Sequence, residues 1–326
     1  MATQKREQVG IIGLGKMGAA LALQALEKNC EVVGFTLGGA SSELKAAGLT
    51  VAERAEDLRT LLARPRRVLL YIPAGPAVDE LLGQLESILE PGDLIVDAGN
   101  SYWGDSLRRQ ARLQARGLEF VDLGTSGGIS GARQGACFMA GGTPSAIAMI
   151  EPLLRSLAVT DGYTHAGPPG AGHFTKLVHN GIEFGMLQAI GEGVNLLEKY
   201  PHAPLPIEKI LKVWNHGSVI RSWLVELMEQ AYVQEGGVDK VPPYIEDTGE
   251  VNWLISDALH LEAPVPVIAQ AVMQLFTSRD KDQKSARAIA MMRHGFGGHP
   301  YGPNAGIRSE RQTGRIVDDF LMDPAV

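Results

Sequence analysis

One stretch decides the fold of this 326-residue chain: Val9-Gly-Ile-Ile-Gly-Leu-Gly-Lys-Met-Gly18. Its apolar start predicts a short strand, which runs directly into the spacing Gly-x-Gly-x-x-Gly. A helical pattern follows from Ala19 to about Lys28, and a second apolar strand is expected at Glu31–Phe35. Strand, glycine turn, helix and strand in this order are typical of a Rossmann-type dinucleotide-binding domain.

Each glycine of the motif has a physical role in binding a dinucleotide. Gly13 allows the tight turn, Gly15 lets the backbone approach the pyrophosphate, and Gly18 lets the helix pack on the strand. The N-terminus of the helix then faces the phosphates. A purely structural glycine turn is the alternative, but the flanking strand and helix favour the cofactor site. The expected cofactor loop consists of Gly13, Leu14, Gly15, Lys16, Met17 and Gly18.

The end of the second strand normally distinguishes NAD from NADP. An Asp or Glu there accepts from the ribose hydroxyls of NAD, and an Arg suits the 2′-phosphate of NADP. The segment Phe35–Ser42 contains neither. Thr36, Ser41 and Ser42 could donate to a phosphate or to a ribose, so both cofactors stay open. The lack of an acid that would repel a phosphate gives a slight preference for NADP.

The alternation of strands and helices continues through the first half of the chain. Further strands and helices are expected at Arg67–Ile72, Val78–Leu89, Leu94–Asp97, Phe120–Leu123 and Pro144–Leu157. In such sheets ligands bind beyond the carboxyl ends of the strands. The residues expected to line the nicotinamide side are therefore Ile72, Pro73, Ala74 and Asn100. For Asn100, the alternative is a turn residue that caps the next helix.

Glycine is dense between Gly124 and Gly142. We interpret this segment as a loop whose exposed backbone N–H groups suit an anion or a carboxylate, with a flexible surface loop as the alternative. The apolar run Cys137-Phe-Met139 indicates that the loop is packed. The run Gly167-Pro-Pro-Gly170 then marks the boundary between a dinucleotide-binding domain, residues 1–168, and a second domain, residues 169–326.

The second domain opens with a long helix, expected from about Gly170 to about Tyr200. Four polar side chains share one face of it, at i, i+3, i+4 and i+7: Lys176, His179, Asn180 and Glu183. An amine, an imidazole, an amide and a carboxylate along about 10 Å of helix suit acid–base work on a small polar substrate. A solvated face is the alternative. His and Asn are poor helix formers, which favours function. Later helical patterns predict an all-α second domain with a C-terminal tail.

Composition excludes several classes of protein. The net charge of −7 argues against non-specific binding of nucleic acid or of an anionic membrane surface. Cys30 and Cys137 cannot form a disulfide framework, so a reducing compartment is expected. We find no signal peptide and no apolar run long enough to cross a bilayer, and the expected location is the cytoplasm. No Cys/His cluster has the spacing of a metal site.

Four motifs together resemble one enzyme family. They are Gly13–Gly18, Asp97–Ser101, Ser126–Arg133 and Lys176–Glu183, in this order. The chain resembles decarboxylating 6-phosphogluconate dehydrogenase, in the shorter bacterial-type subfamily of the β-hydroxyacid dehydrogenase superfamily. The likeness covers roughly residues 8–300, and the Lys-x-x-His-Asn-x-x-Glu pattern is its most specific part.

The resemblance implies oxidative decarboxylation of 6-phospho-D-gluconate to D-ribulose 5-phosphate and CO2, with hydride transfer to NAD or NADP. It implies that Lys176 takes the proton from the C3 hydroxyl and that Glu183 protonates C1 after CO2 leaves. Such a lysine needs a lowered pKa. The residues implied to hold the carboxylate and hydroxyls of the substrate are Asn100, Ser126, Gly127, Gly128, His179 and Asn180. No metal is implied.

The substrate phosphate needs cations, and these are concentrated between Ser278 and His299. The resemblance implies that Arg293 and His299 bind the phosphate from a partner subunit. Lys284 or Arg287 falls near a further phosphate-binding position, and both stay open. A solvated basic helix is the alternative for each. If these roles hold, the enzyme is a homodimer or a higher homo-oligomer with a shared active site.

The chain departs from the family at two places. Longer members carry a tyrosine after the catalytic Glu, whose hydroxyl reaches the phosphate, and this chain has Phe184. In the subfamily's Ser-Gly-Glu-Gly-Arg-Trp segment, Val251-Asn252 stands here in place of Gly-Arg. The runner-up function is a dehydrogenase of a small unphosphorylated β-hydroxyacid, which needs no second anion site. A non-catalytic nucleotide sensor would have no use for both Lys176 and Glu183.

Overall fold

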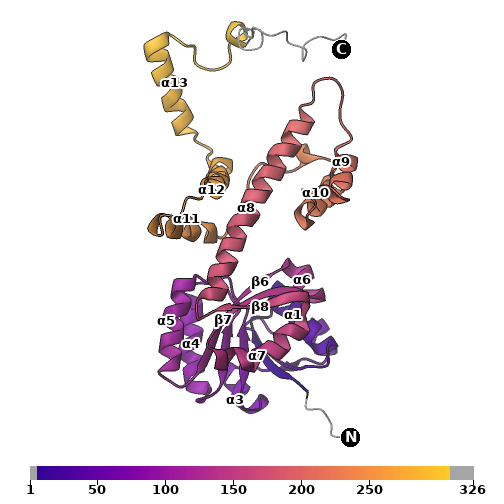
Figure 1. Ribbon diagram of the computed structural model, residues 1–326, viewed down its shortest axis with the longest axis vertical. Helices are drawn as coiled ribbons and strands as arrows, with labels where there is room; N and C mark the ends of the chain where they lie inside the picture. Colours follow the sequence, from indigo (N-terminus) through magenta and orange to yellow (C-terminus); the bar gives the residue numbers. More distant parts are fainter. Residues whose placement is uncertain (1–5, 309–326) are drawn as a thin grey trace. The chain divides into compact units, whose positions relative to one another are not determined.

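The computed structural model describes residues 6–308. The chain divides into two compact units (Figure 1): residues 1–181 with 249–257 form unit 1, and residues 182–248 with 258–326 form unit 2. The predicted fold class is confirmed, because an α/β dinucleotide-binding domain is followed by a helical one. The predicted boundary between residues 168 and 169 stays a prediction, since the division into units falls inside a helix.

Unit 1 is built on an eight-stranded sheet with the order β3-β2-β1-β4-β5-β6-β7-β8. Strands β1 to β6 pair in parallel, β7 is antiparallel to β6, and β8 is parallel to β7. The strands are β1 (Gln8–Ile12), β2 (Glu31–Phe35), β3 (Thr50–Val51), β4 (Arg67–Leu70), β5 (Leu94–Asp97), β6 (Glu119–Ser126), β7 (Ala136–Gly142) and β8 (Ala158–Gly167).

Helices of unit 1 contribute to two apolar cores that share the strands of the sheet. One core contains side chains of α1, α2 and α7, and the other contains side chains of η1, α3, α4 and α5. The buried strand residues are mainly Val, Ile and Leu, as a parallel sheet covered on both faces requires. The elements are α1 (Lys16–Glu27), α2 (Ser42–Ala46), η1 (Ala55–Asp57), α3 (Leu58–Leu61), α4 (Pro76–Ile88), α5 (Trp103–Gln114), α6 (Gly128–Gln134) and α7 (Pro144–Leu157).

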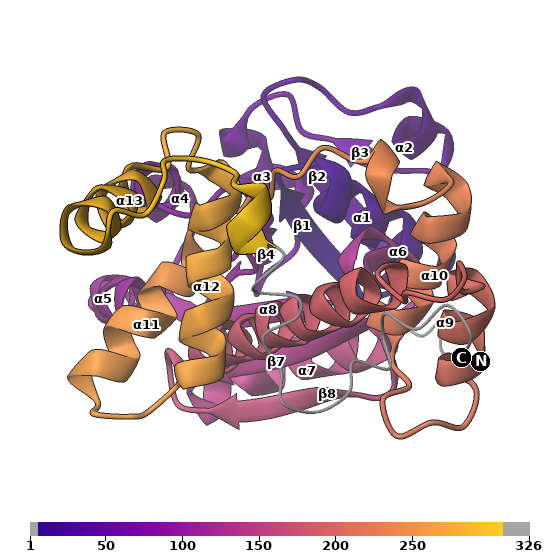
Figure 2. The same ribbon diagram turned by 90° about the horizontal axis from the view of Figure 1, so that it is seen from above.

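The long helix predicted after Gly170 is confirmed as α8 (Ala171–Glu198), which begins in unit 1 and continues into unit 2 (Figure 2). Within unit 2, its C-terminal half packs with α9 and α10 around a small apolar cluster. The remaining elements are α9 (Ile207–Asn215), α10 (Trp223–Glu235), η2 (Val238–Lys240), α11 (Glu250–His260), α12 (Pro266–Arg279) and α13 (Lys284–Gly297). The tail beyond residue 308 lies outside the described residues.

The interpretation of residues 124–142 as one loop is wrong. Strand β6 extends to Ser126, α6 follows, and β7 occupies Ala136–Gly142. The glycines in the strands serve close packing: a Cβ atom on Gly141 would lie 2.5 Å from the backbone N of Gly172 at the start of α8. A strand glycine at such a contact marks the close approach of another backbone.

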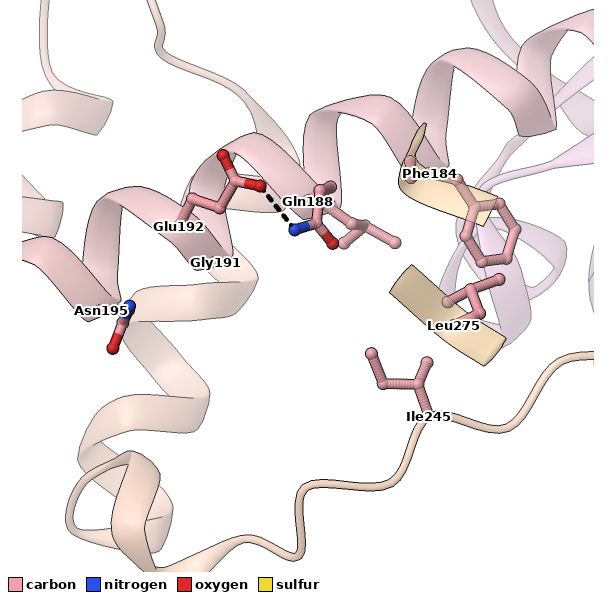
Figure 3. A pocket seen from close by; sticks show the side chains of 9 residues that line it. Phe184, Gln188, Gly191, Glu192, Asn195, Ile245 and Leu275 are labelled. Carbon is pink, nitrogen blue, oxygen red and sulfur yellow. Dashed lines mark hydrogen bonds between the residues drawn. The ribbon is translucent and has the colours of Figure 1, made fainter. Parts of the chain in front are cut away.

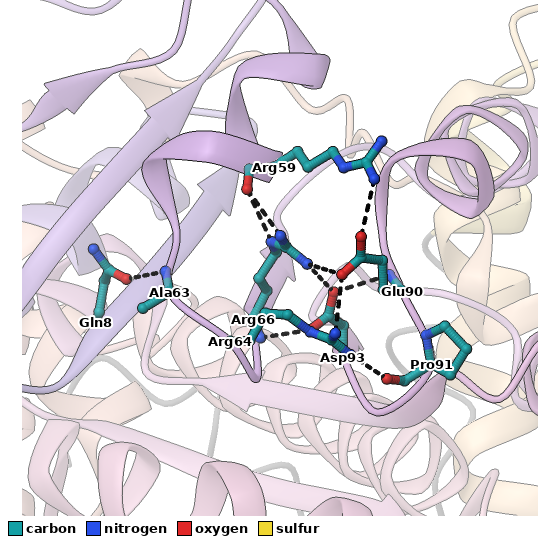
Figure 4. Close-up of polar contacts among 8 residues, drawn as sticks. All are labelled: Gln8, Arg59, Ala63, Arg64, Arg66, Glu90, Pro91 and Asp93. Carbon is teal, nitrogen blue, oxygen red and sulfur yellow. Dashed lines mark hydrogen bonds and ion pairs between the residues drawn. The ribbon is translucent and has the colours of Figure 1, made fainter.

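Buried ionic groups stabilise the amino ends of the parallel strands (Figure 4). Asp93, fully buried just before β5, accepts 2.8 Å bonds from the guanidinium and from the backbone N of Arg66. Glu90 pairs with Arg59, Arg64 and Arg66, and its bond to Arg59 is the main cause of its lowered pKa. This network lies at the edge of the sheet opposite the carboxyl ends of the strands.

Among the described residues, no helix combines the length and the apolar character needed to cross a membrane.

Candidate active site

Two of the four polar side chains predicted on the long helix, His179 and Asn180, meet residues at the end of β6 and after β5, and a third, Lys176, contacts His179. Nδ1 of His179 lies 3.3 Å from Nζ of Lys176, and Nε2 lies 3.0 Å from Oγ of Ser126. The amide of Asn180 donates to Oδ1 of Asn100 over 3.4 Å, and its Oδ1 lies 3.2 Å from Nδ1 of His179. Residues from three separate segments of unit 1 therefore form one polar cluster.

This geometry suits a lysine that changes its protonation state. A protonated Lys176 can donate to Nδ1 of His179, while Nε2–H of His179 donates to Ser126. A neutral Lys176 can instead accept from Nδ1–H, while the Ser126 hydroxyl donates to Nε2. The imidazole thus has a tautomer for each state of the amine, and the cluster can hold or release a proton at Nζ.

The glycine motif has the backbone geometry that a cofactor loop requires. Gly13 has φ +91°, and its N–H donates to the carbonyl of Phe35 over 2.9 Å. A Cβ atom at Gly18 would overlap the carbonyl of Gly13, so only glycine fits there. Helix α1 begins at Lys16 with no side-chain cap, which leaves its first N–H groups directed into the loop. These residues fit a pyrophosphate at the helix N-terminus.

The end of β2 does not carry a charged group that would favour NAD over NADP or the reverse. Leu37 is 97% exposed, and the Ser41 hydroxyl is already engaged as the cap of α2, where it accepts from Leu44 N. Thr36 and Ser42 remain as candidate neutral donors at this edge. NAD or NADP is the cofactor of the fold, and both remain open for this chain.

A buried arginine connects the loops after β4 and β5. Arg109 of α5 is fully buried, and it donates to Asp79, to the carbonyl of Gly75 and to Asp97. Asp97 in turn accepts from Gly99 N over 3.2 Å. Bonds from Arg109 also lower the pKa of Asp79. The loops predicted to line the nicotinamide, Ile72–Ala74 and Asn100, are held by this network.

Another contact joins β4 to the end of β6. Burial raises the pKa of Tyr71 to about 12, so its hydroxyl stays protonated at neutral pH. This hydroxyl lies 3.3 Å from Oγ1 of Thr125, next to Ser126. The predicted anion-binding residues Gly127 and Gly128 follow, with Gly127 at φ +113° before the first turn of α6.

Sequence reasoning missed the residues that anchor α8. Asp122 of β6 is fully buried and accepts from the backbone N of Gly170 and of His173. His173 is itself buried, with Nδ1 2.7 Å from Oγ of Ser106. The available signal was the alternation of Asp122, Gly124 and Ser126 on one face of a strand.

Comparison with known proteins assigns the chain to a family. Two family models cover nearly the whole chain: the NAD binding domain of 6-phosphogluconate dehydrogenase matches residues 8–167, and the C-terminal domain of 6-phosphogluconate dehydrogenase matches residues 172–310. The chain belongs to the 6-phosphogluconate dehydrogenase family. It is therefore an oxidoreductase that uses NAD or NADP.

Individual relatives match most of the chain. YqeC of Bacillus subtilis (strain 168) is 42% identical over 293 residues, which cover 90% of this chain and 98% of YqeC. An NAD(+)-dependent, decarboxylating 6-phosphogluconate dehydrogenase of Haloferax volcanii is 39% identical, with 90% and 97% covered. The solved 6-phosphogluconate dehydrogenase of Plasmodium falciparum has a TM-score of 0.76 at 28% identity, and 93% of this chain and 68% of that chain are covered.

In this 6-phosphogluconate dehydrogenase family member, the remaining predicted site residues belong to unit 2. Glu183 lies on the continuation of α8, just beyond the division between the units. Lys284, Arg287, Arg293 and His299 lie on or next to α13, which has no buried residue. Arg293 Nη2 is 3.4 Å from Nε2 of His299, so these two groups are already paired. Their roles in binding a phosphate stay predictions.

The segment with Val251-Asn252 is partly helical, since α11 begins at Glu250. Val251 is buried and Asn252 is exposed. The same helix carries the buried Asp257, which accepts 2.8 Å and 2.7 Å bonds from the Tyr102 hydroxyl and from Nε1 of Trp103. These two aromatic residues directly follow Asn100-Ser101, so α11 supports the loop that carries Asn100.

Proposed function

We propose that this enzyme oxidises and decarboxylates 6-phospho-D-gluconate, giving D-ribulose 5-phosphate, CO2 and reduced NAD or NADP. The observation that carries the proposal is the cluster of Lys176 and His179 with Asn180, Asn100 and Ser126. It combines an amine that can take a proton with amide and hydroxyl groups that suit a sugar acid. The family supports the same reaction.

In this proposal Lys176 takes the proton of the C3 hydroxyl while hydride leaves C3 for the nicotinamide that the bound cofactor supplies. The resulting 3-keto acid loses CO2, and protonated Lys176 polarises the ketone. Glu183, two helical turns further along α8, then protonates C1. Asn100, His179, Asn180 and Ser126–Gly128 bind the carboxylate and the hydroxyls of the substrate. Arg293, His299 and either Lys284 or Arg287 bind the phosphate.

We further propose that the enzyme works as a homodimer or a higher homo-oligomer in the cytoplasm. Helix α13 buries none of its side chains. Its apolar residues Ile289 and Phe296 are 50% and 75% exposed. Helices α8 and α12 line a pocket of about 330 Å³ together with Ile245; it is largely apolar around Phe184 and Leu275 (Figure 3). Exposed apolar surface of this kind is typical of an interface. A second copy of the chain is the expected occupant.

The deciding experiment is an initial-rate assay of the purified enzyme with 6-phosphogluconate and with 3-hydroxyisobutyrate, each with NAD and with NADP. We expect turnover of the phosphorylated acid with CO2 release, and faster turnover with NADP. Turnover of 3-hydroxyisobutyrate alone would replace the proposed function with the runner-up.

Lys176→Met tests the proposed base. The variant keeps a long apolar stem and loses the amine, so we expect oxidation to fall by at least about a hundredfold because general-base catalysis is lost. The affinity for the cofactor, measured by NADPH fluorescence, should stay near that of the wild type. Undiminished turnover would remove Lys176 from the mechanism.

A further inference from the structure

Strand β6 presents three alternate residues to α8. Asp122, Gly124 and Ser126 share one face of the strand, because successive side chains in a strand point to opposite sides. Asp122 binds the N–H groups at the start of the helix, Gly124 lies against the Cβ of Lys176, and Ser126 contacts the ring of His179. Contacts at three levels along one strand restrict both rotation and translation of the first two turns of α8.

Asp122 fixes the beginning of the helix. Its Oδ1 accepts from the N–H of Gly170 over 2.7 Å, and its Oδ2 accepts from the N–H of His173 over 2.8 Å. These are among the N–H groups that have no partner inside the helix. Burial raises the pKa of the Asp122 carboxyl, which shows that the surroundings disfavour the charge that the amides bind.

Gly124 fixes the next turn. A Cβ atom built on Gly124 would lie 2.6 Å from the Cβ of Lys176 and 3.1 Å from the carbonyl of Gly172. The Cβ of Lys176 is rigidly attached to the helix backbone, so the helix itself would have to move. The absence of a side chain at Gly124 therefore sets how close Lys176 lies to the sheet.

We propose that Asp122 is a positioning residue, which together with Gly124 sets the rotation and height of α8 so that Lys176 reaches the C3 hydroxyl of the substrate. The proposal rests on the proposed function, since it takes Lys176 as the base. A displacement of about 1 Å at a reacting group can cost about a hundredfold in rate. A helix that turned by one residue would carry Lys176, His179 and Asn180 together away from Ser126 and Asn100.

The test is Asp122→Asn in the full-length enzyme, with Asp93→Asn as the matched control. Asp93 is also fully buried and also accepts from two backbone N–H groups, those of Arg66 and Glu90, but at the opposite ends of the strands. In Asp122→Asn, an amide NH2 replaces one acceptor and faces a helix N–H. We expect kcat with 6-phosphogluconate to fall about 10- to 100-fold while NADPH affinity is retained. Asp93→Asn should lose thermal stability and keep the wild-type kcat.

Hydrogen exchange supplies a readout that does not depend on the substrate. Amides of Gly170 to Lys176 should exchange faster in Asp122→Asn and at the wild-type rate in Asp93→Asn. A wild-type enzyme inactive on 6-phosphogluconate would remove the proposed function, and exchange at α8 would then decide whether Asp122 holds the helix. Equal kcat losses in both variants, or unchanged exchange at α8, would overturn the positioning role. If Asp122→Asn does not fold, Gly124→Ala takes its place, with the same expected loss of kcat.

Discussion

At the scale of single residues, His179 connects Lys176, the proposed base, to the rest of the cluster. Its two nitrogens contact Lys176 and Ser126, which come from a helix and from a strand end. The i+3 spacing places His179 beside Lys176, as the sequence predicts. The contact with Ser126 depends on the packing of β6 on α8 and could not be predicted from spacing.

Glu183→Gln tests the second proposed catalytic group. The amide keeps the size of the side chain but cannot donate a proton to C1, and general acids contribute about 10²- to 10⁴-fold. We expect steady-state formation of ribulose 5-phosphate to fall, while binding of NADP is unchanged. Product analysis by stopped-flow and quench measurements checks this.

The control for this variant is Glu208→Gln, an exposed carboxylate on α9. It should turn over like the wild type. Wild-type rates in Glu183→Gln as well would show that another group protonates C1.

At the scale of secondary-structure elements, α5 holds two functional loops through one buried side chain. Arg109 bonds to Asp79, Asp97 and the carbonyl of Gly75, so it connects the loop after β4 with the loop after β5. Asp97 needs this cation, because the carboxylate is fully buried. The preceding residue, Arg108, bonds to the same Asp79 but is mostly exposed.

Arg109→Leu should therefore destabilise the protein far more than Arg108→Leu. Leaving Asp97 buried without its cation should lower the free energy of unfolding by about 3–5 kcal/mol. Loss of the exposed pair should cost less than about 1 kcal/mol. Urea unfolding of both variants measures the difference, and equal stabilities would contradict the assigned role of Arg109.

At the scale of the whole molecule, unit 1 has large apolar cores whereas α13 of unit 2 has none of its side chains buried. Its exposed apolar residues include Ile289, Met291, Met292 and Phe296. A helix with no fully buried side chain among the described residues gains little from folding alone. A second subunit that covers α13 would provide the missing burial.

Ile289→Asp should weaken self-association, because it introduces a charge into the proposed interface. A central apolar position is expected to cost at least about 2 kcal/mol of association. As the protein is diluted, its sedimentation coefficient, measured by sedimentation velocity, and its specific activity should fall together. The control is Val219→Asp, at a fully exposed position outside α8, α12 and α13, which should leave both unchanged. An active monomer would rule out a shared site.

The sequence by itself determined what depends on local spacing. The glycine motif of β1 and α1 identified the dinucleotide fold, and helical periodicity identified α8 with Lys176, His179 and Asn180 on one face. These features can be recognised in the sequence because, within one helix or turn, the residues that lie close together in space are also close together in the chain.

Only the tertiary structure decided the contacts between distant segments. The density of glycines predicted a loop, yet Gly124 and Gly141 are strand residues against which the backbone of α8 packs. The alternation of Asp122, Gly124 and Ser126 marked one face of β6, but the partners of Asp122 lie about 50 residues later, at the start of α8, and only the fold brings them together. Such contacts depend on the chain's path through three dimensions, and no period or spacing along the sequence records that path.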